Sequence, residues 1–381
     1  MSRRRRTTDE TPRPQTSTRD LDDLRDRLVA WLAQRLPPGA DPRVSEFEVP
    51  DSNGLSSETV LFDLTRRDSG RARVDRLVAR LAPMASAVPV FPSYDLERQY
   101  RTLEGVAALS GVPVPRLRWL ELDAGALGSP FFVMDRIDGQ VPPDLMPYNI
   151  ASWLTEATPA QRDHLQDETV RILADLHAIP EPTERFAFLS PAGTGSLLER
   201  NVAEQWAYYE WVSAGTRQPL LERCFEWLRS HWPADEGAAV LSWGDSRIGN
   251  VIYRDFEPVA VLDWEMATLG PPELDLGWLI FLHRFFQDVA AQFELPGLPD
   301  FLRRDDVATR YEALTGHTPR DLDYYTLYAA LRHGIIMSRI QQRAIHFGEA
   351  EAPDDPDDLI THRATLEAML DGGYWSQFIP A

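Results

Sequence analysis

The chain has 381 residues, of which 43% are hydrophobic, so it can form two domains or one large domain with a sizeable core. Its net charge of −20 argues against nucleic-acid binding as the main role, because neutralising phosphates requires a basic surface. No apolar run is long enough for a transmembrane helix, and the Arg-rich N-terminus lacks the apolar region of a signal peptide. The single cysteine, Cys224, excludes an internal disulfide and a Cys-rich zinc site. We therefore expect a cytoplasmic protein that binds neither nucleic acid nor membranes.

Lysine is missing from the sequence, so all 39 basic residues are arginine. A Walker A loop needs a Gly-Lys-Ser/Thr segment and is excluded, as is Schiff-base chemistry on a lysine. Any nucleotide phosphate must therefore be held by arginine, by backbone N–H groups or by a metal. Arginine is permanently charged and binds phosphate in a bidentate manner, with a geometry that differs from that of lysine.

The N-terminal part of the chain is predicted to be a disordered tail, residues 1–18, followed by a helix over 21–36 and then a sheet. The tail is polar and rich in Arg, Thr and Pro, whereas the helix has apolar residues at helical spacing and is closed by two prolines. Alternating patterns then predict strands at 45–50, 58–67 and 74–83.

The loop before the second of these strands contains Gly, Ser and Asn, with Ser56 and Ser57 at its end. A small-residue loop between two strands can cover phosphates with backbone amides. An ordinary hairpin connection explains the same residues, so the loop alone does not decide between the two readings.

A helix over 95–109 and strands over 112–122 and 129–137 complete this region, which we expect to span residues 19–140. A Pro-rich connection at 142–149 marks the change to a second, mainly helical region, residues 141–381. Helical patterns there cover 159–178, two segments within 196–232, 321–346 and 357–371.

The most informative stretch is 241–282. Asp245 follows Gly244 at the end of an apolar strand, and Asn250 comes five positions later. Two apolar runs then flank the turn sequence Asp-Phe-Glu-Pro at 255–258, and Asp263 lies where the second run ends. A tight hairpin folds its two ends together, so Asn250 and Asp263 should be neighbours, with Asp245 one loop away.

This trio suits phosphoryl transfer. Mg²⁺ prefers oxygen ligands and takes only one or two from carboxylates, which Asn250 and Asp263 could supply. Asp245, left free of metal, could orient a substrate hydroxyl and accept its proton. Two other interpretations stay open: Asp and Asn are common at strand ends in any case, and a metal-dependent hydrolase could use the same carboxylates.

Three segments carry a family resemblance. WGDSRIGN at 243–250, VLDWEMATLGPPELDLGWL at 261–279 and LADLHAI at 173–179 resemble the core of the aminoglycoside phosphotransferases and related choline-kinase-like small-molecule kinases. The resemblance covers about residues 44–346. It implies an α+β, two-lobed protein-kinase-like fold, with an antiparallel sheet and a helix in the N-lobe and a larger, mainly helical C-lobe. It also implies that ATP and Mg²⁺ bind in the cleft between the lobes.

The resemblance assigns roles to individual residues. Asp245 stands at the position of the catalytic base, and Asn250 and Asp263 stand at the positions of the Mg²⁺ ligands. Arg80 occupies the strand position where kinases keep the phosphate-binding lysine, and Glu97 is its implied partner on the following helix.

The same resemblance implies the nucleotide contacts. Main-chain groups of the hinge, at Met134, Asp135 and Ile137, would read the adenine. The loop that ends in Ser56 and Ser57 would cover the phosphates.

Two residues depart from the family pattern. Trp243 replaces the histidine that usually precedes Gly-Asp, and Arg80 replaces the lysine. Trp243 must therefore support the catalytic loop in a different way, together with Asp275, the implied buried acid at a helix start. These departures also motivate an alternative function, a nucleotide-binding pseudokinase with a regulatory or scaffold role.

The acceptor substrate is the least constrained feature of the sequence. We expect a small molecule with a hydroxyl group: an aminoglycoside, an amino alcohol or another alcohol. Glu265, Trp278 and His283 lie near the expected mouth of the site and are candidate substrate contacts. His177 is expected to be a hydrogen-bonded core histidine. The protein is expected to be a monomer or a homodimer.

Overall fold

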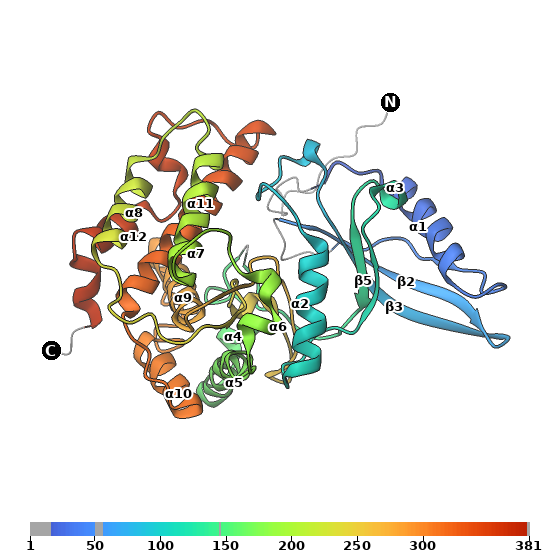
Figure 1. The fold of residues 1–381 in the computed structure, drawn as a ribbon, viewed down its shortest axis with the longest axis horizontal. Helices are drawn as coiled ribbons and strands as arrows, with labels where there is room; N and C mark the ends of the chain where they lie inside the picture. The colour runs from blue at the N-terminus through green and yellow to red at the C-terminus, as the bar shows by residue number, and fades with distance from the viewer. Residues whose placement is uncertain (1–16, 50–55, 145, 379–381) are drawn as a thin grey trace.

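The computed structural model of the protein describes residues 17–49, 56–144 and 146–378, and most of the predicted tail lies outside them. The N-terminal lobe is built on a five-stranded antiparallel sheet with the order β1-β2-β3-β5-β4 (Figure 1). The strands are β1 (Arg43–Val44), β2 (Glu58–Asp68), β3 (Arg71–Leu81), β4 (Leu117–Glu121) and β5 (Phe131–Asp135).

Alternation along the strands decides what each face of the sheet contacts. Leu77, Ala79 and Leu81 of β3 face α1 (Leu21–Arg35), which covers the outer side of the sheet. Val78 and Arg80 therefore point to the other side, where α2 (Leu96–Leu109) packs (Figure 1). The two-residue period thus places the Arg80 side chain on the face that turns toward the second lobe.

The structure corrects two of the predicted strands. The prediction of a strand at 45–50 is wrong for the described residues 45–49, where only an isolated bridge between Glu48 and Leu61 forms, and β1 ends just before them. The strand expected at 112–122 shortens to β4 because Pro113 and Pro115 have no N–H to donate to a sheet. Arg19, just after the predicted tail, is tied to the lobe by hydrogen bonds to Leu127 and Ala82.

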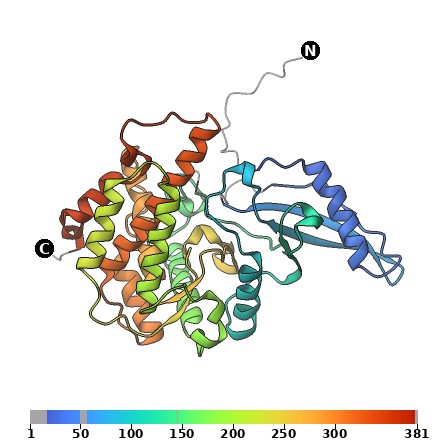
Figure 2. The same ribbon diagram turned by 45° about the horizontal axis from the view of Figure 1, so that its top comes forward.

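The second lobe is mainly helical, and Figure 2 shows several of its helices lying side by side. α9 and α11 pack against each other and, with α7 and α8, enclose an aromatic-rich core. The predicted helix at 357–371 forms only in part, as a short turn and then α12. The helices are α4 (Trp153–Glu156), α5 (Pro159–His177), α6 (Pro182–Arg185), α7 (Leu197–Val212), α8 (Pro219–Ser230), α9 (Glu273–Gln292), α10 (Arg304–Thr315), α11 (Leu322–His346) and α12 (Arg363–Leu370).

Two short antiparallel pairs, neither part of the large sheet, lie within the helical lobe. β6 (Val240–Ser242) pairs with β9 (Thr268–Gly270), and β7 (Val251–Arg254) pairs with β8 (Glu257–Val261). The short helix α3 (Ala124–Leu127) precedes β5 in the N-terminal lobe and was not expected from the sequence.

The chain crosses between the lobes directly after β5. Gln140 and the β7 residue Tyr253 exchange two backbone hydrogen bonds of 2.8 Å, so Gln140 already contacts the helical lobe. The preceding Gly139 is needed at this crossing, since a Cβ there would lie 2.4 Å from the side chain of Ile252 and 2.6 Å from the carbonyl oxygen of Tyr253. The crossing is therefore held closely against the hairpin.

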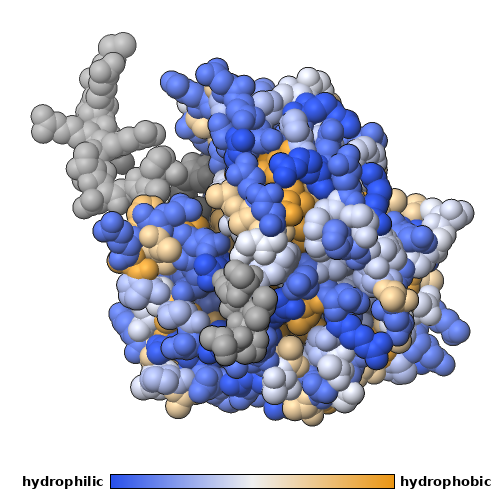
Figure 3. Space-filling view, turned by 90° about the vertical axis from the view of Figure 1, so that its left-hand side faces the viewer, coloured by the Kyte–Doolittle hydropathy of each residue, from blue (hydrophilic) through white to orange (hydrophobic). Residues whose placement is uncertain are grey.

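The face of the helical lobe in Figure 3 is mainly hydrophilic, with apolar residues gathered in small patches. Within the described residues, we find no helix long and apolar enough to cross a membrane.

Candidate active site

The loop that carries Asp245, predicted to be catalytic, begins at a glycine that no other residue could replace without a shift of the chain. Gly244 follows β6 with φ of +88°, and a Cβ at this position would lie 2.0 Å from the carbonyl oxygen of Met266. Asp245 comes next. A single turn of 3-10 helix then leads to Asn250, the last residue before β7.

The β7–β8 hairpin has the tight geometry that the sequence predicts. Its turn consists of Asp255 and Phe256, both with positive φ, as in the two-residue turns that match the twist of paired strands. The Leu262 N–H donates to the Asn250 carbonyl at 2.8 Å. The hairpin therefore joins Asn250 to the strand end that carries Asp263, which confirms that part of the prediction.

The Asp245 carboxylate accepts hydrogen bonds from three side chains. The Trp278 indole N–H donates at 2.7 Å, the Asn250 amide donates at 2.7 Å, and Arg247 Nε lies 3.1 Å from Oδ1. Arg247 is shared with Asp144, with which it forms a second ion pair. Arg247 Nε also lies 3.2 Å from Oδ2, so each oxygen has two N–H partners and the carboxylate is fixed in orientation.

Asp275 anchors the start of the loop that carries Asp245. Its fully buried carboxylate accepts from the backbone N–H groups of Trp243 and Gly244, both at 2.8 Å, and from the Ser242 hydroxyl. His177 Nε2 lies 3.0 Å away, while His177 Nδ1 pairs with a tyrosine hydroxyl. Burial alone would raise the pKa of Asp275, but these hydrogen bonds and His177 outweigh it and the pKa is lowered.

Trp243, which stands where the resemblance has a histidine, is buried and hydrogen-bonded to the end of the hairpin. Its ring is 1% exposed, and its indole N–H donates to the carbonyls of Leu262 at 2.9 Å and Asp263 at 3.2 Å. The side chain therefore links the catalytic loop to the strand end that presents Asp263. Asp263 itself has φ of +59°, a conformation that costs energy in a non-glycine residue and is typical of functional sites.

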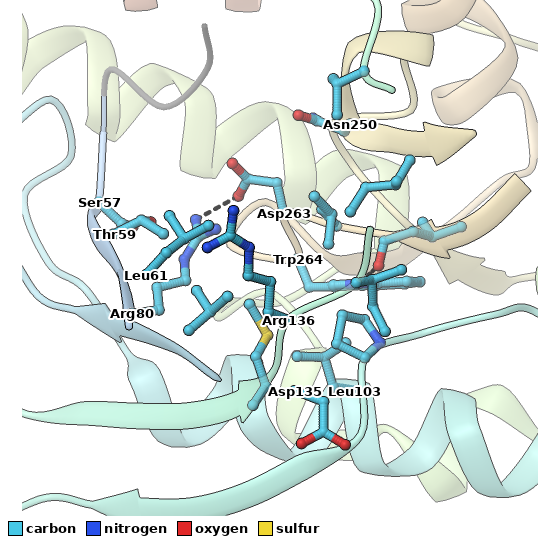
Figure 4. Close-up of a pocket in the computed structure, with 18 of the residues that line it drawn as sticks. Ser57, Thr59, Leu61, Arg80, Leu103, Asp135, Arg136, Asn250, Asp263 and Trp264 are labelled. Carbon is cyan, nitrogen blue, oxygen red and sulfur yellow. Dashed lines mark hydrogen bonds and ion pairs between the residues drawn. The ribbon is translucent and has the colours of Figure 1, made fainter. Parts of the chain in front are cut away.

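Arg80 reaches across from the N-terminal lobe to Asp263. Its Nη2 lies 2.6 Å from Asp263 Oδ1 and 3.2 Å from Glu265 Oε2, and Ser57 donates to the same Glu265 oxygen at 2.9 Å (Figure 4 draws the contact with Asp263). Nε of Arg80 is buried without a hydrogen-bond partner among the described residues. One guanidinium thus donates to two carboxylates, and its Nε–H group has no acceptor in the described structure.

Asp263 and Glu265 share Arg80 as their counter-ion. Burial and the neighbouring Asp263 raise the pKa of Glu265 to about 7, although Arg80 acts in the opposite direction. If Arg80 moved to another partner, the pKa of Glu265 would rise further. The cluster is therefore sensitive to any ligand that changes the contacts of Arg80.

A cavity of about 310 Å³ opens between the lobes beside this cluster. Figure 4 shows Asp263 and Asn250 turned toward the same region of it, with Asp135 directed away. The floor and walls combine strand residues of the sheet, the segment after β5 and the hairpin of the helical lobe. The sequence-predicted residues that line it are Ser57, Arg80, Met134, Asp135, Ile137, Asn250 and Asp263.

The oxygen atoms at this cavity fit a magnesium ion bound mainly by phosphates. Among the described residues no cluster of three or more His, Cys, Asp and Glu is placed to hold a metal. Asp263 uses only Oδ1 for Arg80, and Asn250 uses its amide nitrogen for Asp245. One carboxylate oxygen and one amide oxygen therefore stay available, which suits an ion that takes few protein ligands.

Several predicted contacts have a different environment. The pair expected between Arg80 and Glu97 is wrong, since Glu97 is exposed on α2 and Arg80 is bound to Asp263 and Glu265. Glu265 therefore lies beside Arg80 and Ser57, away from the expected substrate mouth. Ser56 donates to a tyrosine hydroxyl and does not line the cavity.

The other two substrate candidates lie on α9. Trp278 holds Asp245, as described above, and is only 2% exposed. His283 is a core residue, which corrects its assignment as a substrate contact. Its Nδ1 pairs with Tyr148 at 2.6 Å, and burial lowers its pKa to about 4.

Sequence reasoning missed three residues that the structure brings to the site. Arg247 lies inside the recognised motif, and its charge beside Asp245 was a signal that could have been used. Asp144 lies in the Pro-rich connection, and only the fold shows that it meets Arg247. Gln99 is 3% exposed and lines the cavity from α2, the helix on which Glu97 was chosen instead.

A sequence profile of the phosphotransferase enzyme family matches residues 49–310, which is more than half of the chain and includes the whole cavity-lining set. The chain belongs to the phosphotransferase enzyme family. It is thus a phosphotransferase, and the expected family is confirmed.

Curated relatives of this phosphotransferase are much longer proteins. The probable acyl-CoA dehydrogenase IBR3 of Arabidopsis thaliana is 24% identical over 86% of the chain, but the match covers 40% of that protein. Acyl-CoA dehydrogenase family member 10 of Mus musculus is 28% identical over 70% of the chain and 25% of its own length. The chain therefore spans two fifths or less of these relatives.

Solved structures confirm the fold. A protein of Ralstonia eutropha JMP134, provisionally described as an aminoglycoside phosphotransferase, has a TM-score of 0.64 with 23% identity, covering 92% of this chain and 98% of the other. Aminoglycoside phosphotransferase APH(4)-Ia, in a ternary complex with AMP-PNP and hygromycin B, has a TM-score of 0.54 with 14% identity, covering 91% and 98%. The two-lobed α+β architecture predicted from the sequence is thus confirmed.

Proposed function

We propose that this phosphotransferase moves the γ-phosphate of ATP to a hydroxyl group of a small molecule. The observation that carries the proposal is the joint placement of Asp245, Asn250 and Asp263 at one end of a tight hairpin, beside a cavity between two lobes. Three side-chain donors, two from the loop itself and one from α9, fix the first of these carboxylates, which is the preorganisation that phosphoryl transfer requires.

In this proposal Asp245 orients the acceptor hydroxyl and takes its proton as the oxygen–phosphorus bond forms and the bond to the β-phosphate oxygen breaks. Trp278 and Arg247 hold the carboxylate in place. ADP and the phosphorylated alcohol are the products. Arg80, freed from Asp263, turns its guanidinium to the phosphates, which gives its unbonded Nε a partner.

Asn250 and Asp263 would hold the metal through one oxygen each. A bound Mg²⁺ would supply positive charge that neutralises the charge developing on the phosphates. The hydrogen bond from Trp243 would keep the backbone of Asp263 fixed when the Asp263 side chain leaves Arg80 to hold the metal. A cytoplasmic location, where ATP and Mg²⁺ are available, is part of the proposal.

The acceptor class is tested with a broad panel. Wild-type protein is incubated with Mg²⁺, γ-labelled ATP and aminoglycosides, amino alcohols, simple alcohols and hydroxyl-bearing acyl thioesters, the last because of the names of the curated relatives. We expect label to move to at least one acceptor, in a reaction that needs both Mg²⁺ and the alcohol. Hydrolysis of ATP with no dependence on any acceptor contradicts the proposal.

The same assay separates the enzyme from a pseudokinase. Calorimetry with MgATP measures binding independently of turnover. Tight MgATP binding, with no transfer to any acceptor across the panel, would favour the regulatory or scaffold role. Because Trp243 and Asp275 hold the loop in a fully hydrogen-bonded state, we expect turnover.

A further inference from the structure

A buried arginine that does not line the cavity packs on the indole ring that holds Asp245. Arg332, on α11, is only 6% exposed. Its guanidinium carbon lies 4.9 Å from the centre of the Trp278 ring, the ring whose N–H donates to Asp245. A single indole therefore separates the guanidinium from the proposed base.

Within the described part of the chain, Arg332 has no hydrogen-bond or ion-pair partner, and its Nε is buried and unbonded. Its contacts are with the aromatic faces of Trp278 and Tyr328. Glu204 influences Tyr328 electrostatically but forms no ion pair with Arg332. A buried charge without a counter-ion is costly, so proteins rarely keep one without a use for it.

The neighbouring groups do not neutralise Arg332. Nδ1 of the next residue, His333, lies 3.3 Å from Nδ1 of His362. Burial lowers the pKa of His333, and its neighbours His362 and Arg247 lower it further. Arg247 therefore acts on this side of the site too, but it is already paired with Asp144 and Asp245.

The position relative to the nucleotide decides what the arginine could bind. Asn250 approaches Asp245 from the cavity side, and Trp278 approaches it from α9. In-line transfer places the acceptor opposite the leaving group. Because Asn250 and Trp278 donate to different oxygens of the Asp245 carboxylate, an acceptor opposite the nucleotide would approach from the Trp278 side, where Arg332 is the unpaired charge.

We propose that the acceptor alcohol carries an anionic group, a carboxylate or a phosphate, that pairs with Arg332 while its hydroxyl lies against Asp245. The proposal rests on the proposed phosphotransferase function and adds the chemical class of the acceptor. It disfavours polycationic acceptors such as aminoglycosides. The overall charge of −20 slows the approach of anions, so a local cation is required to retain one.

The kinetic test compares matched acceptors. Hydroxy carboxylic acids of increasing chain length, the phosphate monoesters of alkane diols, and the uncharged diols are assayed with MgATP. We expect kcat/KM to be at least about tenfold higher for one anionic series than for the diols, the strength of a charge-assisted hydrogen bond. The better of the two anionic series identifies the group as a carboxylate or a phosphate.

Arg332→Met removes the charge and should abolish this preference, mainly through KM, whereas Arg332→Lys should retain part of it. Arg339→Met is the matched control: Arg339 lies on the same helix and stacks on Trp211 at 4.5 Å, but its Nε is bonded to a carbonyl. The control should keep the preference. Equal activity of wild type on anionic and neutral acceptors would overturn the proposal.

A binding assay keeps the proposal testable without turnover. With MgAMP-PNP present, the thermal midpoint of wild type is measured against increasing concentrations of the same acids and monoesters. We expect stabilisation in wild type and in Arg339→Met, and none in Arg332→Met. In the absence of ligand, Arg332→Met should be at least as stable as wild type, because an unpaired buried charge is removed.

A lower unliganded midpoint together with unchanged anion stabilisation in Arg332→Met would mean a purely structural arginine. Failure of the phosphotransferase proposal is separate, since it appears as absent MgATP binding or absent transfer to any alcohol.

Discussion

The loop that carries Asp245 and the Arg80 side of the cleft hold their carboxylates in opposite ways. Asp275 below the loop is completely satisfied by backbone N–H groups, a hydroxyl and His177, all from the helical lobe. Across the cleft, Arg80 is divided between Asp263 and Glu265 and keeps an unbonded Nε. The first arrangement is complete without a ligand, whereas the second is one that a bound nucleotide would rearrange.

The largest expected effect comes from breaking the complete arrangement. Asp275→Ala leaves two buried backbone donors and His177 without their acceptor, and should reduce the free energy of unfolding by about 3–5 kcal/mol. Urea denaturation followed by circular dichroism measures the loss. Asp371→Ala, at an exposed helix end, is the control, and an equal midpoint for the two variants would contradict the anchoring role.

The next effect concerns the metal. Asp263→Ala removes one of the two proposed protein ligands and should weaken the binding of MgATP by about 100-fold or more, since even indirect partners of a metal contribute 10–100-fold. Calorimetry with ATP in the absence of Mg²⁺ serves as the control, because the loss should be confined to the metal complex. An unchanged Mg²⁺ dependence of activity would rule out Asp263 as a ligand.

Substituting Glu265 and Glu97 in turn tests which carboxylate pairs with Arg80. Glu265→Gln should raise the KM for MgATP about tenfold, the range of one hydrogen bond to a charged group, because Arg80 loses the carboxylate that holds it when the metal occupies Asp263. Glu97→Gln, on the exposed side of α2, should leave KM unchanged. Steady-state kinetics measure KM for both variants. A larger rise for Glu97→Gln than for Glu265→Gln would instead support the pair of Arg80 with Glu97 that the family pattern implies.

The smallest effect is a pH dependence of stability. The folded pKa of Glu265, raised to about 7, lies above its ordinary value of 4.5, so the folded protein binds this proton more tightly than the unfolded chain. The resulting stability is complete below pH 4.5 and is lost as pH rises to about 7. Glu265→Gln should remove this change, of order 1 kcal/mol. Denaturation of both proteins at pH 5 and pH 8 measures it, and identical pH profiles would count against the assignment.

The two regions also differ in how far the sequence predicted them. The placement of Asn250 beside the strand end of Asp263 follows from a two-residue turn and from strand alternation, which are local properties of the chain. The orientation of Arg80 toward the cleft follows from the same alternation. The family resemblance indicated Asp275, and the structure shows how its hydrogen bonds are arranged.

The partners of Arg80 and Arg247 could not be predicted in this way. Glu265 and Asp144 are separated from them by 185 and 103 positions, and only the packing of the lobes brings the pairs together. His283 was misassigned because the sequence does not show that its side chain, five positions after Trp278 on the same helix, points into the core. Its neighbours Tyr148 and Leu298 come from elsewhere in the chain and enclose it.

The most direct test of the account is Asp245→Asn, measured for binding and turnover side by side. The proposed division of roles assigns proton transfer to Asp245 and metal binding to Asn250 and Asp263. Calorimetry should therefore give nearly the wild-type MgATP affinity, while kcat for the best acceptor falls roughly 10²-fold or more, the loss expected for a positioned base. Loss of MgATP binding with kcat intact would contradict the account.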